Sequence, residues 1–234
     1  FDNHVVPKKF NILSILIVNP SPSPFEGVLL LEKRWLNGSV VDAPQIEPLF
    51  MGPTSRRLVT FYPSVLHSAE TWKIAAQGLG GVDFERTLDS PPAGPRAFVI
   101  LEDPKAIGRS SGSLQRFDET IFPPVSSATD ALQGVVLDHA PRWDEPRRVA
   151  FLQWLQAGGQ LHLFQGPGGK FPEFTSILAV LNAPLDRFHV GAGTVVRHPL
   201  ATSKLTSEYA SEHVYPKNDR PKATANQWNS NNYG

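Results

Sequence analysis

Three acidic residues stand at the ends of apolar runs, in positions where a fold often places its chemistry. Glu102 and Asp103 end RAFVILED (96–103), and Asp138 lies near the end of LQGVVLDH (132–139). If these runs are parallel strands, their carboxyl ends meet at one sheet edge, where open α/β sheets bind ligands. Acidic residues are also ordinary turn formers. We therefore take Asp103 and Asp138 as candidate ligand-binding residues and assign them no catalytic role.

A glycine cluster follows a third apolar run, GGQLHLFQG (158–166). The cluster does not match the phosphate-binding motif GxxxxGK[ST]. Phe164 replaces the first glycine of the motif, and Phe171 replaces its serine or threonine. The dinucleotide pattern GxGxxG also fails at Phe171. We predict a structural turn here, with no cofactor. The remaining candidate ligand-binding residues are Gln165, Gly166, Gly168, Gly169 and Lys170.

Residues 108–112 match the hydrolase pattern GxSxG, with Ser110 at the nucleophile position. A nucleophile elbow needs this serine on a tight turn between a strand and a helix. Residues 102–107 separate Ser110 from the nearest predicted strand, and no helix begins at Gly112, so the pattern favours a flexible serine-rich loop. The alternative function is a hydrolase. It would use either Ser110 or a metal ion held by carboxylates at the carboxyl ends of the predicted parallel strands.

The seven histidines form no metal-binding pattern. His162 lies inside an apolar run, which favours a hydrogen-bonded core residue. His189 and His198 flank a predicted hairpin, and their spacing matches neither HxH nor HExxH. We predict no metal site.

From residue 96 onward the chain alternates between predicted strands and helices. The runs at 96–103, 132–139 and 158–166 are typical of parallel strands buried on both faces. Asp144 and Pro146 suit the start of a helix, and Gly158 suits its end. A second helix is expected over 171–184 and a strand or hairpin over 189–199. The order predicts right-handed βαβ units in a doubly wound domain over 96–200.

The first part of the chain has a different pattern. β-rich segments at 10–18, 27–35, 56–63 and 71–79 alternate with prolines and glycines, which predicts an antiparallel β-sandwich over 1–88. The stretch DSPPAGP (89–95) is the expected domain boundary. Residues 201–234 are polar, and we expect a loosely packed extension that its scattered aromatic residues could dock onto the body: Tyr209, Tyr215, Trp228 and Tyr233.

The composition excludes several classes of partner. Lysine plus arginine and aspartate plus glutamate both number 22, so no net field attracts nucleic acid or an anionic membrane. The longest apolar run, 12–18, is too short for a membrane helix. Because the chain begins at Phe1 and ends in a polar stretch, we expect a piece of a longer protein, with any membrane attachment through segments outside it.

The segment LQGVVLDHAPRWDEPRRVAFLQWLQAGGQLHLFQG resembles the recurring unit of class I glutamine-amidotransferase-like proteins, including trehalose-utilisation-type domains. In these proteins a strand, a helix of the AL..WV..GG type and a strand of the G.L.L..G type follow one another. The resemblance spans roughly half the chain and implies a flavodoxin-like fold for the doubly wound domain. The residues that carry it are Gly134 to Leu137, Phe151 to Leu155, Gly158, Gly159 and Leu161 to Gly166.

Enzymes of that superfamily use a cysteine nucleophile with histidine and glutamate partners, and this chain has no cysteine. A serine hydroxyl would need a positioned base in its place. A β-sandwich ahead of such a domain also resembles uncharacterised bacterial envelope proteins. We therefore expect a non-catalytic protein at the periplasmic or extracytoplasmic face of the membrane, which binds other envelope proteins or a small ligand.

A carbohydrate-binding or adhesion module is a further hypothesis. It depends on four aromatic residues of the predicted sandwich, which would have to form an exposed, coplanar row. Such residues fill a core more often than they line a surface. The four are Trp35, Phe61, Tyr62 and Trp72.

Overall fold

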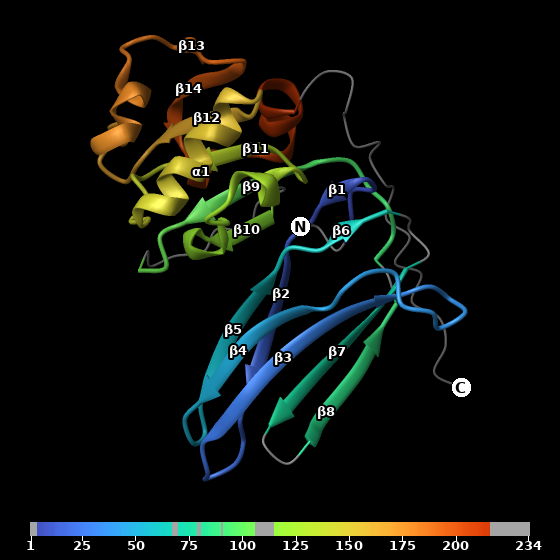
Figure 1. Cartoon of the computed structure of the whole chain (residues 1–234). Helices are drawn as coiled ribbons and strands as arrows, with labels where there is room; N and C mark the ends of the chain where they lie inside the picture. The colour runs from blue at the N-terminus through green and yellow to red at the C-terminus, as the bar shows by residue number, and fades with distance from the viewer. Residues whose placement is uncertain (1–3, 67–69, 79–80, 90, 106–114, 216–234) are drawn as a thin grey trace, which may run out of the picture.

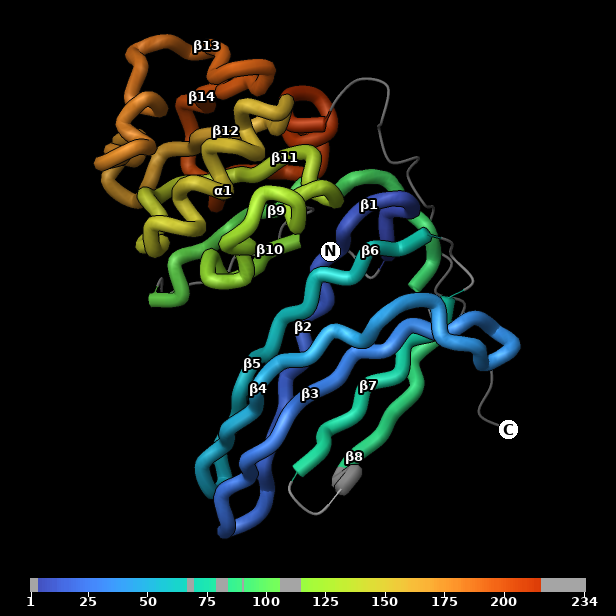
Figure 2. The backbone as a smooth tube through the Cα atoms, viewed as in Figure 1, coloured from blue at the N-terminus to red at the C-terminus, as the bar shows by residue number. Residues whose placement is uncertain are grey.

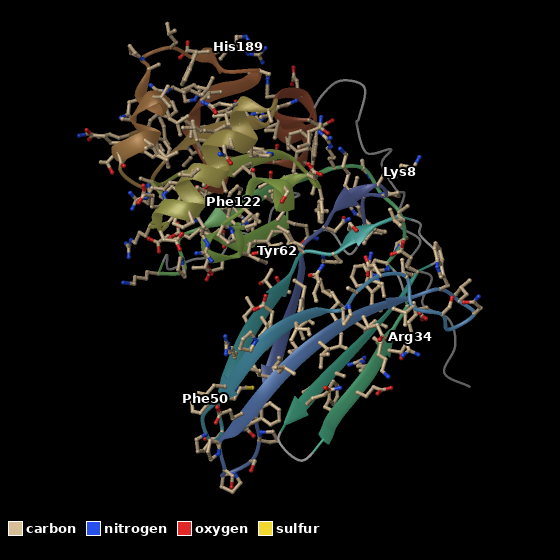
Figure 3. The ribbon with its side chains drawn as sticks, in the orientation of Figure 1. Lys8, Arg34, Phe50, Tyr62, Phe122 and His189 are labelled. Atoms are coloured by element: carbon tan, nitrogen blue, oxygen red, sulfur yellow. The ribbon has the colours of Figure 1, made fainter. Side chains whose placement is uncertain are left out.

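The computed structural model describes residues 4–66, 70–78, 81–89, 91–105 and 115–215, with the backbone alone at 81–83. Antiparallel strands make up the N-terminal half, and a six-stranded mixed sheet with helices makes up the C-terminal half (Figure 1). The predicted combination of an all-β region with an α/β region is therefore confirmed. Tyr62 lies where the two regions meet (Figure 3).

The N-terminal region contains two main sheets that face each other. One has four antiparallel strands in the order β4-β3-β7-β8, and the other is the pair β2-β5. A short pair, β1-β6, lies near the α/β region (Figure 1). The strands are β1 (Lys9–Phe10), β2 (Leu13–Val18), β3 (Phe25–Arg34), β4 (Gln45–Met51), β5 (Arg56–Phe61), β6 (Ser64–Val65), β7 (Thr71–Gly78) and β8 (Gly81–Leu88).

Alternating side chains build the core between these sheets. Leu29 and Leu31 of β3 and Val59 and Phe61 of β5 are all buried, as period-2 patterning requires. The strand β4 was not expected, because it contains Pro48, which cannot donate a ladder hydrogen bond. Its position at the edge of the four-stranded sheet accommodates the proline.

The C-terminal region is built on a sheet with the order β10-β9-β11-β12-β14-β13. All neighbouring strands are parallel except β13 and β14, which form an antiparallel hairpin. The three predicted parallel strands and the hairpin are confirmed. The elements are β9 (Ala97–Glu102), β10 (Gln115–Asp118), β11 (Leu132–Leu137), α1 (Glu145–Gln156), β12 (Gln160–Gln165), β13 (Arg187–Val190) and β14 (Gly193–Ala201).

The helix α1 begins and ends where the sequence predicted. The Asp144 carboxylate accepts the backbone N–H of Arg147, and Pro146 occupies the first turn. Gly158 follows the helix with φ +112°, a conformation that residues with a side chain rarely adopt. These caps fix the direction in which the chain enters β12.

The helix expected over 171–184 forms only in part, as a seven-residue 3-10 helix at Ser176–Asn182 and not as an α-helix. Ser176 has φ +59°, which is incompatible with an α-helix. The Asn182 side chain also binds both the backbone N–H and the C=O of Phe174, so it closes a short loop. Local side-chain bonding of this kind competes with helix formation.

The six-stranded sheet is covered on both faces. α1 packs on one face, where Phe151 and Leu155 join the largest core cluster. On the other face lie α2 (Ser207–Tyr209) and a π-helical turn (Ala210–Val214), which follow β14 and are red in Figure 2. Leu205 and Val214 are buried in the core cluster on this face. Residues 201–215 are therefore packed on the sheet, and the rest of the expected extension, 216–234, lies outside the described residues. None of the described helices is long and apolar enough to cross a membrane.

Candidate functional site at the strand ends

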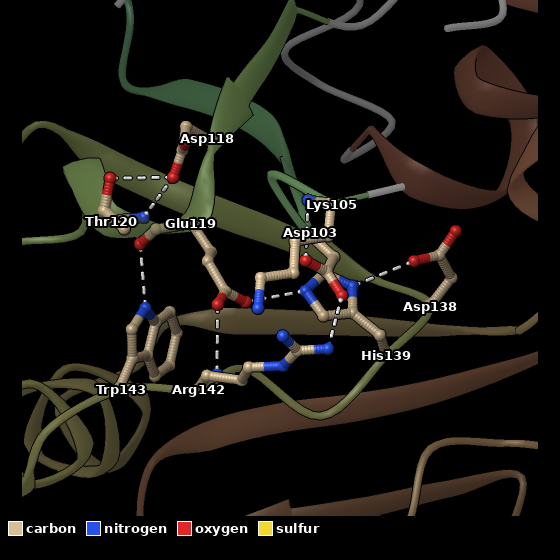
Figure 4. Close-up of polar contacts among 9 residues, drawn as sticks. All are labelled: Asp103, Lys105, Asp118, Glu119, Thr120, Asp138, His139, Arg142 and Trp143. Atoms are coloured by element: carbon tan, nitrogen blue, oxygen red, sulfur yellow. Dashed lines mark hydrogen bonds and ion pairs between the residues drawn. The ribbon is translucent and has the colours of Figure 1, made fainter. Parts of the chain in front are cut away.

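Six polar residues gather at the carboxyl ends of β9, β10 and β11 and at the end of β14. Figure 4 shows all of them except Thr202, and these five approach one another from the three segments that follow β9, β10 and β11. Parallel strands place their carboxyl ends at one edge, which explains why residues far apart in sequence meet here. We call this set the strand-end site: Asp103, Glu119, Asp138, His139, Arg142 and Thr202.

His139 is held between two carboxylates. Its Nε2 lies 2.7 Å from Glu119 Oε2, and its Nδ1 lies 3.0 Å from Asp138 Oδ1. Glu119 is only 3% exposed, so its charge is stabilised by protein groups rather than by water. A carboxylate can only accept hydrogen bonds, so both ring nitrogens of His139 must donate, and the ring is an imidazolium cation.

The pKa shifts of His139 and Asp138 agree with that geometry. Burial alone would lower the pKa of His139, but hydrogen bonds and charge from Asp138 and Glu119 outweigh it and raise the pKa to about 9. Burial alone would raise the pKa of Asp138, but hydrogen bonds from His139 and Thr202 outweigh it and lower the pKa. Both groups are therefore charged at neutral pH.

The other oxygens at the strand-end site also have partners. Glu119 Oε1 accepts the backbone N–H of Arg142 at 3.1 Å, and the Glu119 carbonyl accepts Trp143 Nε1–H at 2.7 Å. Asp103 accepts the Arg142 guanidinium at 3.2 Å and the backbone N–H of Lys105 at 2.9 Å. The set is a closed network of charge-assisted hydrogen bonds.

The Thr202 hydroxyl donates to the second oxygen of Asp138. In a hydrolytic triad the histidine lies between a hydroxyl and a carboxylate, and its free nitrogen accepts the hydroxyl proton. Here the histidine lies between two carboxylates, and the hydroxyl bonds to a carboxylate. Neither nitrogen of His139 is available to act as a general base.

The glycine cluster forms a turn beside this site. The Gly166 N–H donates to the Lys170 carbonyl and the Gly169 N–H to the Gly166 carbonyl, both at 2.9 Å. Gly169 has φ +69°, and no helix begins until Ser176. Two of the amides that could have held a phosphate are thus used within the turn. A Cβ on Gly166 would lie 3.0 Å from the Asp138 carbonyl, so the turn starts against the strand-end site.

Of the candidate residues, the structure brings Asp103 and Asp138 into the strand-end site through Arg142 and His139. Gln165 is half-buried at the end of β12, in register with Ala201. The three residues Gly168, Gly169 and Lys170 are exposed on the turn. Ser110 lies outside the described residues.

Sequence reasoning missed Glu119, Arg142 and Thr202. Glu119 follows β10, a strand of four residues that the sequence showed only as part of a polar stretch. The adjacent pair Asp138-His139 was the available signal, since a histidine beside an acid at a strand end needs a counter-charge. The sequence could not show that Glu119 provides it.

Two histidines, His162 and His198, form a buried pair on the sheet face that also carries Phe98 and Phe164. His162 Nδ1 lies 2.9 Å from His198 Nε2, and His198 Nδ1 lies 2.9 Å from the Tyr209 hydroxyl. Burial is the main cause that lowers the pKa of His162 to about 3 and that of His198 to about 4. Both are neutral core residues, as predicted for His162. In the described part of the chain, no group of three or more acidic or histidine side chains could hold a metal ion.

The aromatic residues proposed for carbohydrate binding do not form a surface row. Phe61 and Trp72 are 1% and 2% exposed and belong to the sandwich core. Two cavities, of about 690 and 600 Å³, lie away from the strand-end site. The first is in the sandwich, and the second is at the amino ends of β9 and β11.

No protein-family model matches the chain, and no curated protein matches it. Among solved structures, a cycloisomaltooligosaccharide glucanotransferase from Paenibacillus sp., complexed with cycloisomaltoheptaose, is similar with a TM-score of 0.30 and 10% identity. The match covers 69% of this chain and 27% of the other chain. A similarity this low carries no argument about fold or activity.

Proposed function

We propose that this chain is a non-catalytic binding or scaffolding protein of the bacterial envelope, with a degenerate amidotransferase-like domain of flavodoxin-like type. The observation that carries the proposal is the state of His139. A cation fixed between Glu119 and Asp138 holds loops together, but it cannot accept a proton from a nucleophile.

Other observations support the same conclusion. The chain contains no cysteine, so the nucleophile of the amidotransferase-like enzymes is missing. The hydroxyl of the strand-end site, that of Thr202, donates to Asp138 and is not paired with a base. The network stabilises the strand ends and leaves Gln165 and the exposed turn at Lys170 as the groups that could contact a ligand.

Turnover measurements test this proposal. The purified chain is assayed with amide, ester, phosphate-ester and glycoside substrates, with and without added Mg²⁺, Mn²⁺ or Zn²⁺. We expect the same background rate for the wild type, His139→Asn and Ser110→Ala. A rate above background that either substitution abolishes would contradict the proposal, and loss in Ser110→Ala would establish the hydrolase instead.

A further inference from the structure

The two sheets of the sandwich differ in width. Four strands face only two, and β5 adjoins β4 through the turn at 52–55, so β2-β5 covers the β4 side of the wider sheet. In the register of β7 with β8, Ile74 is opposite Arg86 and Ala76 is opposite Phe84. Opposite residues share a face, so Phe84 and Arg86 point to the inner side. Phe84 is nevertheless 52% exposed, because none of the described strands covers it.

The uncovered space is an apolar groove of about 690 Å³ between β2 and β8. We call it the sandwich groove. Its floor consists of inner-face residues of the wider sheet, and Arg86 is the only charged residue among its described lining residues. The residues that define the floor and the β8 wall are Leu29, Met51, Ile74, Ala76, Phe84 and Arg86.

The other wall of the groove is an unprotected strand edge. Within the described chain β2 pairs only with β5, so the second edge of its six residues has no ladder partner. Proteins usually protect such edges with charges, prolines or bulges. The sequence of β2, LSILIV, has none of these over a length of ~20 Å. The edge presents backbone donors and acceptors along an apolar groove.

This combination selects one kind of occupant. An acyl chain would cover the floor but would leave the backbone groups of β2 unpaired. A second copy of the chain does not fit. If the β2 edges of two copies paired about a two-fold axis, the four-stranded sheet that packs against each β2 would occupy the same space as that of the other copy. An extended strand satisfies both features, since it pairs with β2 and directs alternate side chains to the floor.

We propose that the sandwich groove binds an extended strand of another polypeptide, which pairs with β2, places alternating apolar side chains on the floor and sets a carboxylate beside Arg86. The carboxylate follows from the charge of Arg86 at an otherwise apolar wall. This inference concerns a different region from the strand-end site and does not depend on whether the α/β region is catalytic.

Peptide binding to the full chain tests the inference. The probe is a fluorescent nine-residue peptide in which valine alternates with threonine and one central valine is replaced by glutamate. We expect saturable binding by anisotropy and slowed amide exchange across 13–18. Arg86→Glu should weaken binding about tenfold or more, and a peptide with lysine in place of glutamate should restore it. Arg56→Glu makes the same charge change on the outer face of β5 and should leave binding unchanged.

Backbone methylation distinguishes a strand from other apolar ligands. Two further peptides carry N-methyl groups on either the odd or the even residues, so each blocks one edge of the strand. We expect one of them to bind like the parent and the other not to bind. The proposal would be overturned if both methylated peptides bound equally well, or if no peptide bound at millimolar concentration. It would also be overturned if oleate competed with the peptide and still bound Arg86→Glu, or if the chain formed a concentration-dependent dimer that the peptide did not dissociate.

Discussion

The strand-end site and the sandwich groove differ in which groups they leave without partners. At the strand-end site the described carboxylates, the imidazolium of His139 and the guanidinium of Arg142 are bonded to one another. In the sandwich groove, apolar side chains and one edge of β2 lack a partner within the described chain. In our two proposals, the charged strand-end site is structural, and the less polar sandwich groove provides the binding surface.

The difference predicts that changes at buried polar groups affect stability strongly, whereas changes in the groove affect it weakly.

Acid should destabilise the α/β region through His162 and His198. Both have folded pKa values, about 3 and about 4, below the unfolded value of 6.5. Their contribution to stability is therefore present above pH 6.5 and is lost as the pH falls toward the folded values. Two such groups predict a loss of about 4 kcal/mol between pH 6.5 and 4.5, measured by urea unfolding at each pH. In the double variant His162→Gln/His198→Gln, the free energy of unfolding should depend less on pH. An unchanged pH dependence would contradict the low pKa values of the two histidines.

Removing the buried charge at Glu119 should destabilise the strand ends. Glu119→Gln keeps the shape of the side chain but removes one counter-charge of His139, which predicts a loss of about 2 kcal/mol in the free energy of unfolding. The exposed Glu173 is the matched control, and Glu173→Gln should change stability by less than ~0.5 kcal/mol. Equal stabilities of the two variants would show that the network contributes little.

The glycine turn predicts a smaller effect that depends on position. Gly169→Ala places a side chain at φ +69° and should lower stability by about 1 kcal/mol. Gly168 lacks a positive φ, and a Cβ there meets open space, so Gly168→Ala should be neutral. Chemical denaturation of both variants makes the comparison, and similar losses would mean that the turn has another conformation.

The smallest effect is expected in the groove itself. Phe84 is half-exposed and no strand in the described part of the chain covers it, so Phe84→Thr should change the free energy of unfolding by less than ~0.5 kcal/mol. A loss above ~1 kcal/mol would show that the groove is already packed, and would weaken the case for a bound strand.

The sequence predicted the parts of the fold that local patterns determine. The caps of α1 and the apolar runs of β9, β11 and β12 are visible because each residue there has one local role. The strand β4 and the 3-10 turn at Ser176–Asn182 depend on an edge position and on the Asn182 side chain, neither of which a local pattern encodes. At the strand-end site, Asp103 and Asp138 were predicted from strand ends. Their partners come from distant loops that only the assembled sheet brings together.

The protonation state of His139 decides whether this side chain can act as a base or only as a fixed cation. Histidine ¹⁵N and ¹³C NMR on the purified chain, assigned with His139→Asn, reports the state of each ring nitrogen as a function of pH. The account predicts two protonated nitrogens at pH 7 and a pKa of about 9. Because the folded pKa is raised, the stabilisation from this group is full below pH 6.5 and is lost as the pH rises through 9. A pKa near 6.5, or one unprotonated nitrogen at pH 7, would leave His139 free to act as a base and would contradict the account.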